Sequence, residues 1–285
     1  MEVLNSWLFF VVFYLVCSVT YNQCYKVTTK SMKSDAAMMV LANSLAGFFC
    51  LFLVPFFEWK FSNDIIVYLL LGLAIIFYTI NDRLETTVMS GVEASTYTIL
   101  SQLSTAFMII LGLVILREPF VWNKILGSAL ILASNVLVFY RRGKFKFDRY
   151  VILGIIANLS YAVAMFIDVN NSDKLNLPLY VFFTLFIPAI IVFLMERVKF
   201  REVKDEFIKA KKLPLFAAIV AYAGFILCSI RAYQLGEVTV VAPLISLTVI
   251  LNVLVGYFFL GERDNLLKKI IASLAIIVGV ILVKG

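Results

Sequence analysis

Histidine is absent from this 285-residue chain, and charged residues make up only 15% of it. The lack of histidine excludes His-based zinc sites and Ser-His-Asp triads. The four cysteines form no Cys-x-x-Cys pair, so the sequence indicates neither a disulfide framework nor a metal site, and we expect no cofactor. A soluble chain would carry about a quarter charged residues. The scarcity of charge therefore favours a chain that is surrounded by lipid.

Apolar residues are abundant and come in long unbroken runs. They make up 62% of the chain, and the mean hydropathy is +0.98. Lipid offers no water to unpaired peptide groups, so only helices or closed barrels span a membrane. Barrel strands alternate apolar and polar residues, which these runs do not. The sequence therefore predicts an all-α, multi-pass integral membrane protein.

A bilayer core about 30 Å thick needs about 20 apolar residues per helix. Runs bounded by charges, proline or glycine predict ten spans, at residues 5–25, 35–57, 65–87, 93–116, 121–140, 150–169, 178–195, 214–235, 238–260 and 267–284. Between the seventh and eighth spans, the mixed-charge stretch 196–213 predicts an interfacial or cytosolic helix. Too few residues remain for a soluble catalytic domain, so we expect no enzyme.

The chain repeats itself. An offset of 144 residues superimposes the first five predicted spans on the last five without a gap. Identical residues at this offset include the pairs Tyr78 and Tyr222, Glu93 and Glu237, Gly112 and Gly256, Glu118 and Glu262, and Lys124 and Lys268. Because five is odd, the second copy enters the membrane from the opposite side. We predict two inverted five-helix units, 1–142 and 143–285, an arrangement that many transporters use to build two access states.

Several segments resemble EamA-type carriers of the drug/metabolite transporter superfamily. They are RAYQLGEVTVVAPL at 231–244, GYFFLGE at 256–262, and VILRE, which closes 92–118. The resemblance implies a carrier of a small metabolite, in a superfamily that handles amino acids, choline and nucleotide sugars. Residues 78–102 also resemble nucleotide-sugar carriers, without a matching signature in the second half. One departure is Ile99, which stands where the second half has Pro243, so the halves are free to bend differently.

Ionisable residues inside a span are costly and are candidates for function. The third span holds the densest group, Tyr78, Asn81, Asp82 and Glu85, at the i, i+3, i+4 and i+7 positions of one helical face. At about 1.5 Å per residue, Asp82 lies some 25 Å from Ile65, near one mouth of a pathway. The alternative is a span that ends near residue 80 and leaves a solvated turn. Burial disfavours the charged form of a carboxyl group, so Asp82 or Glu85 is also a candidate for proton coupling.

Polar faces on other spans complete the predicted substrate site. The remaining candidates are Tyr14 and Asn22 in the first span, Tyr97 in the fourth, Asn158 and Tyr161 in the sixth, and Tyr222 and Arg231 in the eighth. Aromatic rings with carboxylates suit a cation or zwitterion, whereas Arg231 suits a carboxylate or phosphate. The alternative for Arg231 is a salt bridge to Asp82, Glu85 or Glu237. We interpret Glu118 and Glu262 as structural caps of the turns that follow them.

These features predict a carrier that moves an amino acid, an amine or a related amphoteric solute by alternating access, with proton coupling or exchange. The alternatives are a carrier or flippase for nucleotide-sugar-like or lipid-linked substrates and, outside transport, a membrane scaffold. The expected partners are a small-molecule substrate and the lipid bilayer, in a monomer or homodimer. We expect the cell membrane of a prokaryote as the location. Nucleic acid is not expected, because the basic residues lie between apolar runs, where the positive-inside rule accounts for them.

The distribution of charge and the family resemblance predict opposite orientations of the chain in the membrane. Lysine and arginine are concentrated in the connections after the first, fifth, seventh and ninth spans. The positive-inside rule places these connections in the cytoplasm and both termini outside. The family resemblance implies both termini inside. Ten spans put both termini on one side in either case.

Overall fold

The computed structural model describes residues 7–104, 149–235, 244–262 and 265–284, together with Val241 and isolated residues between 106 and 145. Most of the fifth predicted span, 121–140, lies outside the described residues. So do Glu118, Glu237 and Pro243, and with them the expected cap at Glu118 and the expected difference in bending.

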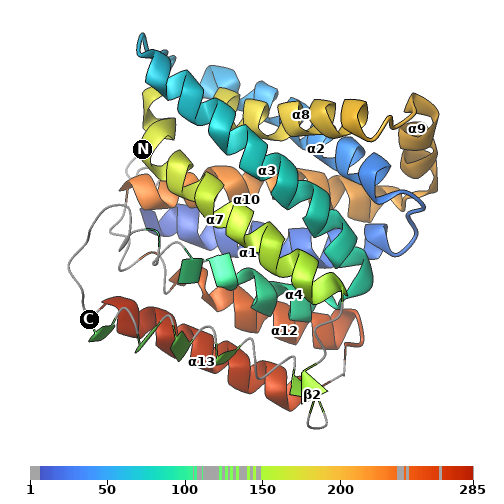
Figure 1. Cartoon of the computed structure of the whole chain (residues 1–285), viewed down its shortest axis with the longest axis vertical. Helices are drawn as coiled ribbons and strands as arrows, with labels where there is room; N and C mark the ends of the chain where they lie inside the picture. The colour runs from blue at the N-terminus through green and yellow to red at the C-terminus, as the bar shows by residue number, and fades with distance from the viewer. Residues whose placement is uncertain are drawn as a thin grey trace.

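The described part of the chain is almost entirely helical (Figure 1). In order, it contains α1 (Trp7–Thr29), α2 (Asp35–Leu53), η2 (Val54–Phe56), α3 (Ile65–Gly91), α4 (Ala94–Ser101), α7 (Arg149–Asn171), η3 (Ser172–Lys174), α8 (Leu177–Met195), α9 (Phe200–Lys209), α10 (Lys212–Leu235), α12 (Leu247–Phe259) and α13 (Leu266–Lys284). Between the halves, β1 (Tyr140–Arg141) pairs antiparallel with β2 (Lys144–Phe145), a short hairpin that the all-helical prediction did not include.

Side-chain caps fix where several of these helices begin. Ser34 accepts a hydrogen bond from the Ala37 amide at the start of α2, and Asp64 accepts one from Ile66 at the start of α3. Asn176 does the same for Leu179 in α8. Each cap satisfies an amide that has no partner within its helix. The apolar spans are therefore delimited by short polar connections, as the sequence predicts.

Within the described ranges, six helical segments are long and apolar enough to cross a membrane: Trp7–Thr29, Asp35–Phe56, Ile65–Gly91, Arg149–Val169, Leu177–Met195 and Lys212–Leu235. They match the first three predicted spans and the sixth to eighth. The apolar helix α12 is shorter and lies on the ninth, and α13 lies on the tenth. The charged stretch 196–213 contains α9, which confirms a helix there.

Helix packing follows the repeat. The longest interfaces pair α1 with α10, α3 with α7 and α2 with α8. At the offset of the repeat, α1 corresponds to α7 and α3 to α10, so the first two interfaces are the same contact with the halves exchanged. The third joins two equivalent helices, and α4 and α12, from the corresponding fourth and ninth predicted spans, also meet. Figure 1 shows α2 and α8 on one side of the α1, α3, α7 and α10 group, and α12 and α13 on the other.

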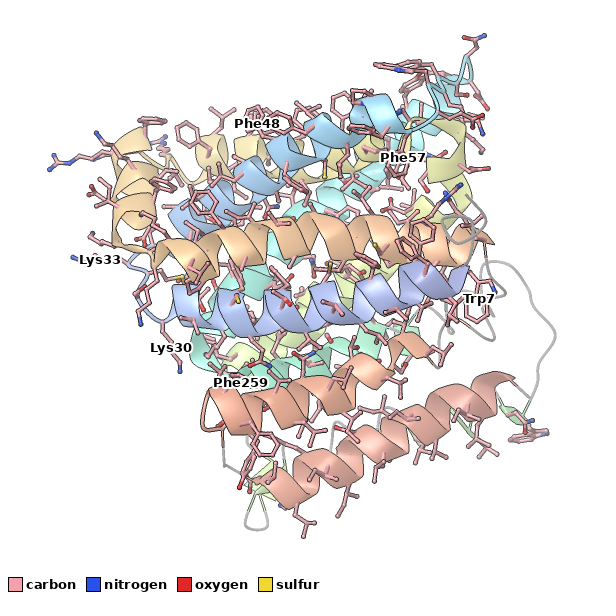
Figure 2. All side chains as sticks on the ribbon, turned by 180° about the vertical axis from the view of Figure 1, so that it is seen from behind. Trp7, Lys30, Lys33, Phe48, Phe57 and Phe259 are labelled. Atoms are coloured by element: carbon pink, nitrogen blue, oxygen red, sulfur yellow. The ribbon has the colours of Figure 1, made fainter. Side chains whose placement is uncertain are left out.

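Helix directions establish that the halves are inverted. Lys26 near the end of α1 donates to Met89 near the end of α3, and Tyr21 donates to Glu85, so α1 and α3 run the same way. Asn171 at the end of α7 donates to the carbonyl of Val67 at the start of α3, so α3 and α7 run in opposite directions. The equivalent helices α1 and α7 therefore run in opposite directions. The bundle also has a basic end, with Lys30 and Lys33, opposite the end that carries Trp7 (Figure 2).

Candidate functional site

The polar face of α3 is buried. The helix has 27 residues and continues to Gly91, with only 3% of Asp82 and 7% of Glu85 exposed. The alternative of a solvated turn after residue 80 is therefore wrong. About 14 Å of helix follows Asp82, so this carboxylate lies deeper than the predicted position near a mouth.

Asp82 is held by neutral donors from three helices. Its Oδ2 accepts a hydrogen bond from the Asn43 amide of α2 at 2.5 Å. Its Oδ1 accepts from the Asn81 amide at 2.9 Å and from the Tyr222 hydroxyl of α10 at 3.1 Å. The carboxylate therefore joins α2, α3 and α10, and it lies behind the face that Asn81 and Glu85 present.

Glu85 lies one turn further along α3 against a stack of tyrosines. The Tyr21 hydroxyl donates to Glu85 Oε1 at 3.1 Å, and the Tyr97 hydroxyl approaches the same carboxylate. The Tyr21 ring stacks on Tyr222, with centroids 4.7 Å apart, and on Tyr25 at 5.1 Å. Aromatic rings from both halves thus surround this carboxylate.

A third buried carboxylate lies apart from this pair. Asp168 of α7 is fully buried and accepts hydrogen bonds from the Tyr78 and Tyr180 hydroxyls, both at 2.6 Å. Tyr78 is thus engaged in packing between α3, α7 and α8.

A cavity of about 120 Å³ lies between the two halves. Seven of the predicted site residues line it: Tyr14, Asn22, Asn81, Glu85, Tyr97, Asn158 and Tyr161. Four others do not belong to the lining: Tyr78, Asp82, Tyr222 and Arg231. Asp82 and Tyr222 support the wall through Asn81 and Tyr21, whereas Tyr78 binds Asp168.

Arg231 lies near the far end of α10 and donates to Gln234 at 3.3 Å. Gln234 in turn donates to Ser172 at the end of α7. The hydrogen-bond partners of Asp82 and Glu85 are amides and hydroxyls, so neither forms the salt bridge to Arg231 that we considered from the sequence. The sequence does not reveal which face of α10 meets the cavity.

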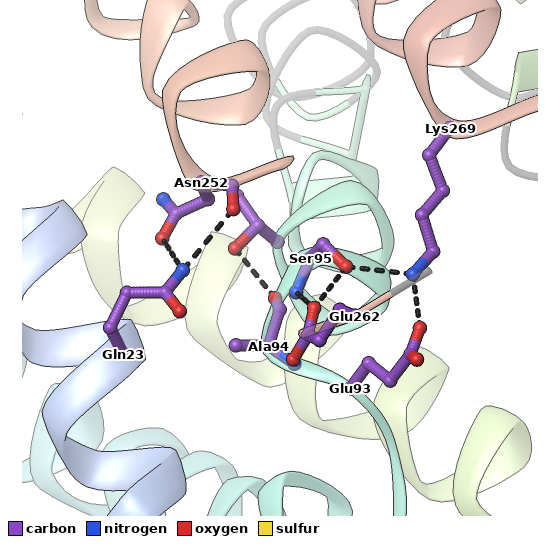
Figure 3. A network of polar contacts seen from close by, with 8 residues as sticks. Gln23, Glu93, Ala94, Ser95, Asn252, Glu262 and Lys269 are labelled. Carbon is purple, nitrogen blue, oxygen red and sulfur yellow. Dashed lines mark hydrogen bonds and ion pairs between the residues drawn. The ribbon is translucent and has the colours of Figure 1, made fainter. Parts of the chain in front are cut away.

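A second polar network joins the halves at the start of α4 (Figure 3). Glu262, which follows α12, accepts the backbone amides of Ala94 at 2.8 Å and Ser95 at 3.1 Å, and also the Ser95 hydroxyl. Lys269 of α13 donates to Ser95 Oγ at 2.8 Å and pairs with Glu93. A carboxylate at a helix N-terminus satisfies free amides and complements the helix dipole. Glu262 therefore caps a helix of the other half, whereas the turn that follows it, where we expected its cap, includes residues 263 and 264, outside the described residues.

Comparison with known proteins agrees with this architecture. The EamA-like transporter family matches the chain twice, over residues 5–140 and 148–285. The chain belongs to this family. The resemblance drawn from the sequence is therefore confirmed, and the protein is an integral membrane member of a family of transporters.

Solved structures show the same fold for this EamA-like protein. Seventeen chains match, and one crystal structure superimposes with a TM-score of 0.64, covering 96% of this chain and 94% of that chain at 12% identity. None of the curated proteins matches the chain.

Three residues of the EamA-like protein that bind the buried carboxylates were not among the predicted site residues. Asn43, a lone amide in the apolar α2, binds Asp82, and its isolation within a span is the signal that could have identified it. Tyr21 belongs to the polar face of the first span, but only the fold reveals its bond to Glu85. Tyr180 binds Asp168 across 12 positions of chain. Each contact depends on how two helices are rotated toward one another.

Proposed function

We propose that this EamA-like protein carries a small polar metabolite across the membrane by alternating access. In this proposal ten spans form two inverted halves, 1–142 and 143–285, and the substrate binds in the cavity between them. The observation that carries the proposal is a polar cavity lined by both halves, by α1, α3 and α4 from the first and α7 and α10 from the second. Inverted repeats commonly place the substrate at such an interface.

The cavity's size supports a small metabolite. Its volume of about 120 Å³ is well below the roughly 300–1,000 Å³ of pockets that hold drug-sized ligands. Nucleotide sugars and lipid-linked sugars are at least drug-sized. Amino acids and small amines are the solutes that this volume favours.

Contacts at the basic end of the bundle support a gate that is closed there. Arg83 of α3 binds Glu196 at the end of α8 through two nitrogens, at 2.5 and 3.1 Å. Glu206 of α9 accepts the backbone amides of Lys33 and Ser34, before α2. Both contacts join the two halves. In the proposed cycle they separate when the cavity opens to this end, and the substrate leaves or enters there.

The proposal also covers how transport is coupled and where the carrier is located. Transport proceeds with proton coupling or by exchange, in the cell membrane of a prokaryote, and the carrier is a monomer or homodimer. A proton gradient across the membrane distinguishes the two coupling modes. Coupled flux follows the gradient, whereas exchange requires substrate on both sides.

Reconstitution tests the function. Purified protein in liposomes is screened on a solid-supported membrane and by tracer uptake with amino acids, amines and nucleotide sugars. We expect flux with one class of small solute and none in protein-free liposomes. Asn22→Trp fills the cavity and abolishes this flux, whereas the matched variant Asn63→Trp, on the exposed connection before α3, retains it. Equal flux in both variants contradicts the cavity as the substrate site, whereas no flux with any class in the parent protein contradicts a carrier and favours a scaffold.

A further inference from the structure

The charges at the cavity are of one sign. Glu85 lines it, and Asp82 lies directly behind Asn81. No lysine or arginine occurs among the described lining residues. Ion pairs in the described part of the chain join Glu58, Glu196 and Glu93 to basic residues and leave Asp82 and Glu85 with amide and hydroxyl donors. A carboxylate buried in a membrane favours a partner of opposite charge, and the described protein lining does not supply one.

An unpartnered amide faces the same cavity. Asn22 lines it, is only 7% exposed, and makes no side-chain hydrogen bond within the described part of the chain. Its amide therefore opens into the cavity, where it is available to hydrogen-bond a ligand or water. Asn22 follows Tyr21, which binds Glu85, so the free amide and the carboxylate belong to one wall.

The rest of the lining combines aromatic rings with serine hydroxyls and carboxamides, and its described residues offer an anion no positive charge. Tyr14 and Phe225 meet edge to face at 6.0 Å, and the other aromatic residues of the described lining are Tyr21, Tyr97, Tyr161 and Tyr233. Aromatic faces attract organic cations. Arg231, the residue that would have bound a substrate carboxylate, is absent from the lining.

We propose that the cavity selects a small organic cation without a carboxylate, a protonated amine or a quaternary ammonium. Glu85 is its counter-charge, Asn22 accepts a hydrogen bond from an amine N–H or from the hydroxyl of a quaternary ammonium alcohol such as choline, and the tyrosine rings contact its alkyl groups. The inference rests on the proposed function and narrows it, because it excludes amino acids and anions from the class of solutes that the cavity binds.

Ligand stabilisation of the purified parent protein tests the inference without any variant. The probes are choline and butylamine as cations, 3,3-dimethyl-1-butanol as the neutral isostere of choline, alanine as a zwitterion, and butyrate as an anion. A ligand that binds the native state raises Tm, and the rise grows with the logarithm of its concentration relative to its Kd. We expect at least one cation to raise Tm and the other three probes to leave it unchanged. Equal stabilisation by the neutral isostere, any stabilisation by alanine or butyrate, or none by either cation overturns the inference.

Glu85→Gln then tests the counter-charge. The amide keeps the size of the side chain and an oxygen for the Tyr21 hydroxyl. We expect affinity for the stabilising cation to fall about tenfold or more, as for loss of a charged hydrogen bond in a buried site. Asp64→Asn is the matched control, a carboxyl-to-amide change at the exposed start of the same helix where asparagine caps equally well. Unchanged affinity in Glu85→Gln overturns the assignment. If that variant does not fold, Asn22→Leu provides the comparison, with the same expected loss and the same contradicting result.

Measurements of binding and of flux distinguish a failure of the cation site from a failure of the proposed carrier. Cation binding in detergent without flux in liposomes would contradict the carrier and leave the cation site intact. Flux of a neutral or anionic solute, with no cation binding, would contradict the cation site and leave the carrier intact.

Discussion

Two tyrosines at equivalent positions of the repeat, Tyr78 and Tyr222, perform the same task with different partners. Tyr78 of α3 donates to Asp168 of α7, and Tyr222 of α10 donates to Asp82 of α3. The carboxylates themselves do not correspond, because the offset of the repeat places Asp82 on Ile226 and Asp168 on Cys24. The two halves therefore share a fold and differ in their buried charges. Only the Asp82 side supports the cavity wall, so we assign Asp168 to packing.

Replacing Asp168 tests this division. In Asp168→Asn the amide retains one acceptor oxygen for two tyrosine hydroxyls, so at least one buried hydrogen bond is lost or reversed. We expect the free energy of unfolding to fall by about 1–3 kcal/mol. Thermal unfolding of the detergent-solubilised protein measures the change, with exposed Asp173→Asn as the control that leaves Tm unaltered. A variant with parental Tm but no flux would instead assign Asp168 to the substrate.

At the scale of helices, close packing between the halves depends on small residues. A methyl group built on Gly224 of α10 would lie 2.9 Å from the sulfur of Cys17 on α1. Small residues let membrane helices approach closely where no hydrophobic force drives them together. The interface between α1 and α10 carries the tyrosine stack that surrounds Glu85, so its spacing also determines the shape of the cavity.

Gly224→Ala is expected to destabilise the protein by about 1–3 kcal/mol, because overpacking forces the two helices apart. Adding Cys17→Ala removes the sulfur, and the double variant should recover most of the lost Tm. Gly72→Ala is the matched control. It adds the same methyl group to α3 at a position with nothing within 4 Å, where alanine is intrinsically the better helix former. If Gly224→Ala and Gly72→Ala shift Tm alike, the close approach of α1 and α10 has no energetic consequence.

Helices of this protein could be predicted from the sequence more fully than their contacts. Long apolar runs specify α1, α2, α3, α7, α8 and α10, since lipid leaves them no other structure. The end of α3 was predicted four residues early, because the polar residues at its end find partners inside the bundle that no local pattern reveals. The cap that Glu262 places on α4 spans 168 positions of chain. The cavity residues could be identified from their polar faces, but Arg231 was misassigned because helix rotation is a property of the fold.

At the scale of the whole molecule, the distribution of basic residues predicts how the inverted bundle is oriented in the membrane. Lys30 and Lys33 lie at the end of the bundle opposite Trp7. The start of α13 meets Glu93 at this same basic end, and its 19 residues extend about 28 Å toward the other. Trp7 and Lys284, the first and last described residues, therefore lie opposite the basic end. The positive-inside rule predicts that the basic end faces the cytoplasm and the termini face outside.

Cysteine accessibility in intact cells tests the orientation. Asn63→Cys places a thiol on the exposed connection between α2 and α3, and Ser31→Cys places one on the exposed connection between α1 and α2, at the opposite end. We expect a membrane-impermeant maleimide to label Asn63→Cys in intact cells and Ser31→Cys only after permeabilisation. The native cysteines lie within helices, so labelling of the parent protein gives the background. The reverse pattern would place both termini in the cytoplasm, as the family resemblance implies. In that case the gate formed by Arg83 and Glu196 would face outside, and the cavity would be closed to the exterior in the observed conformation.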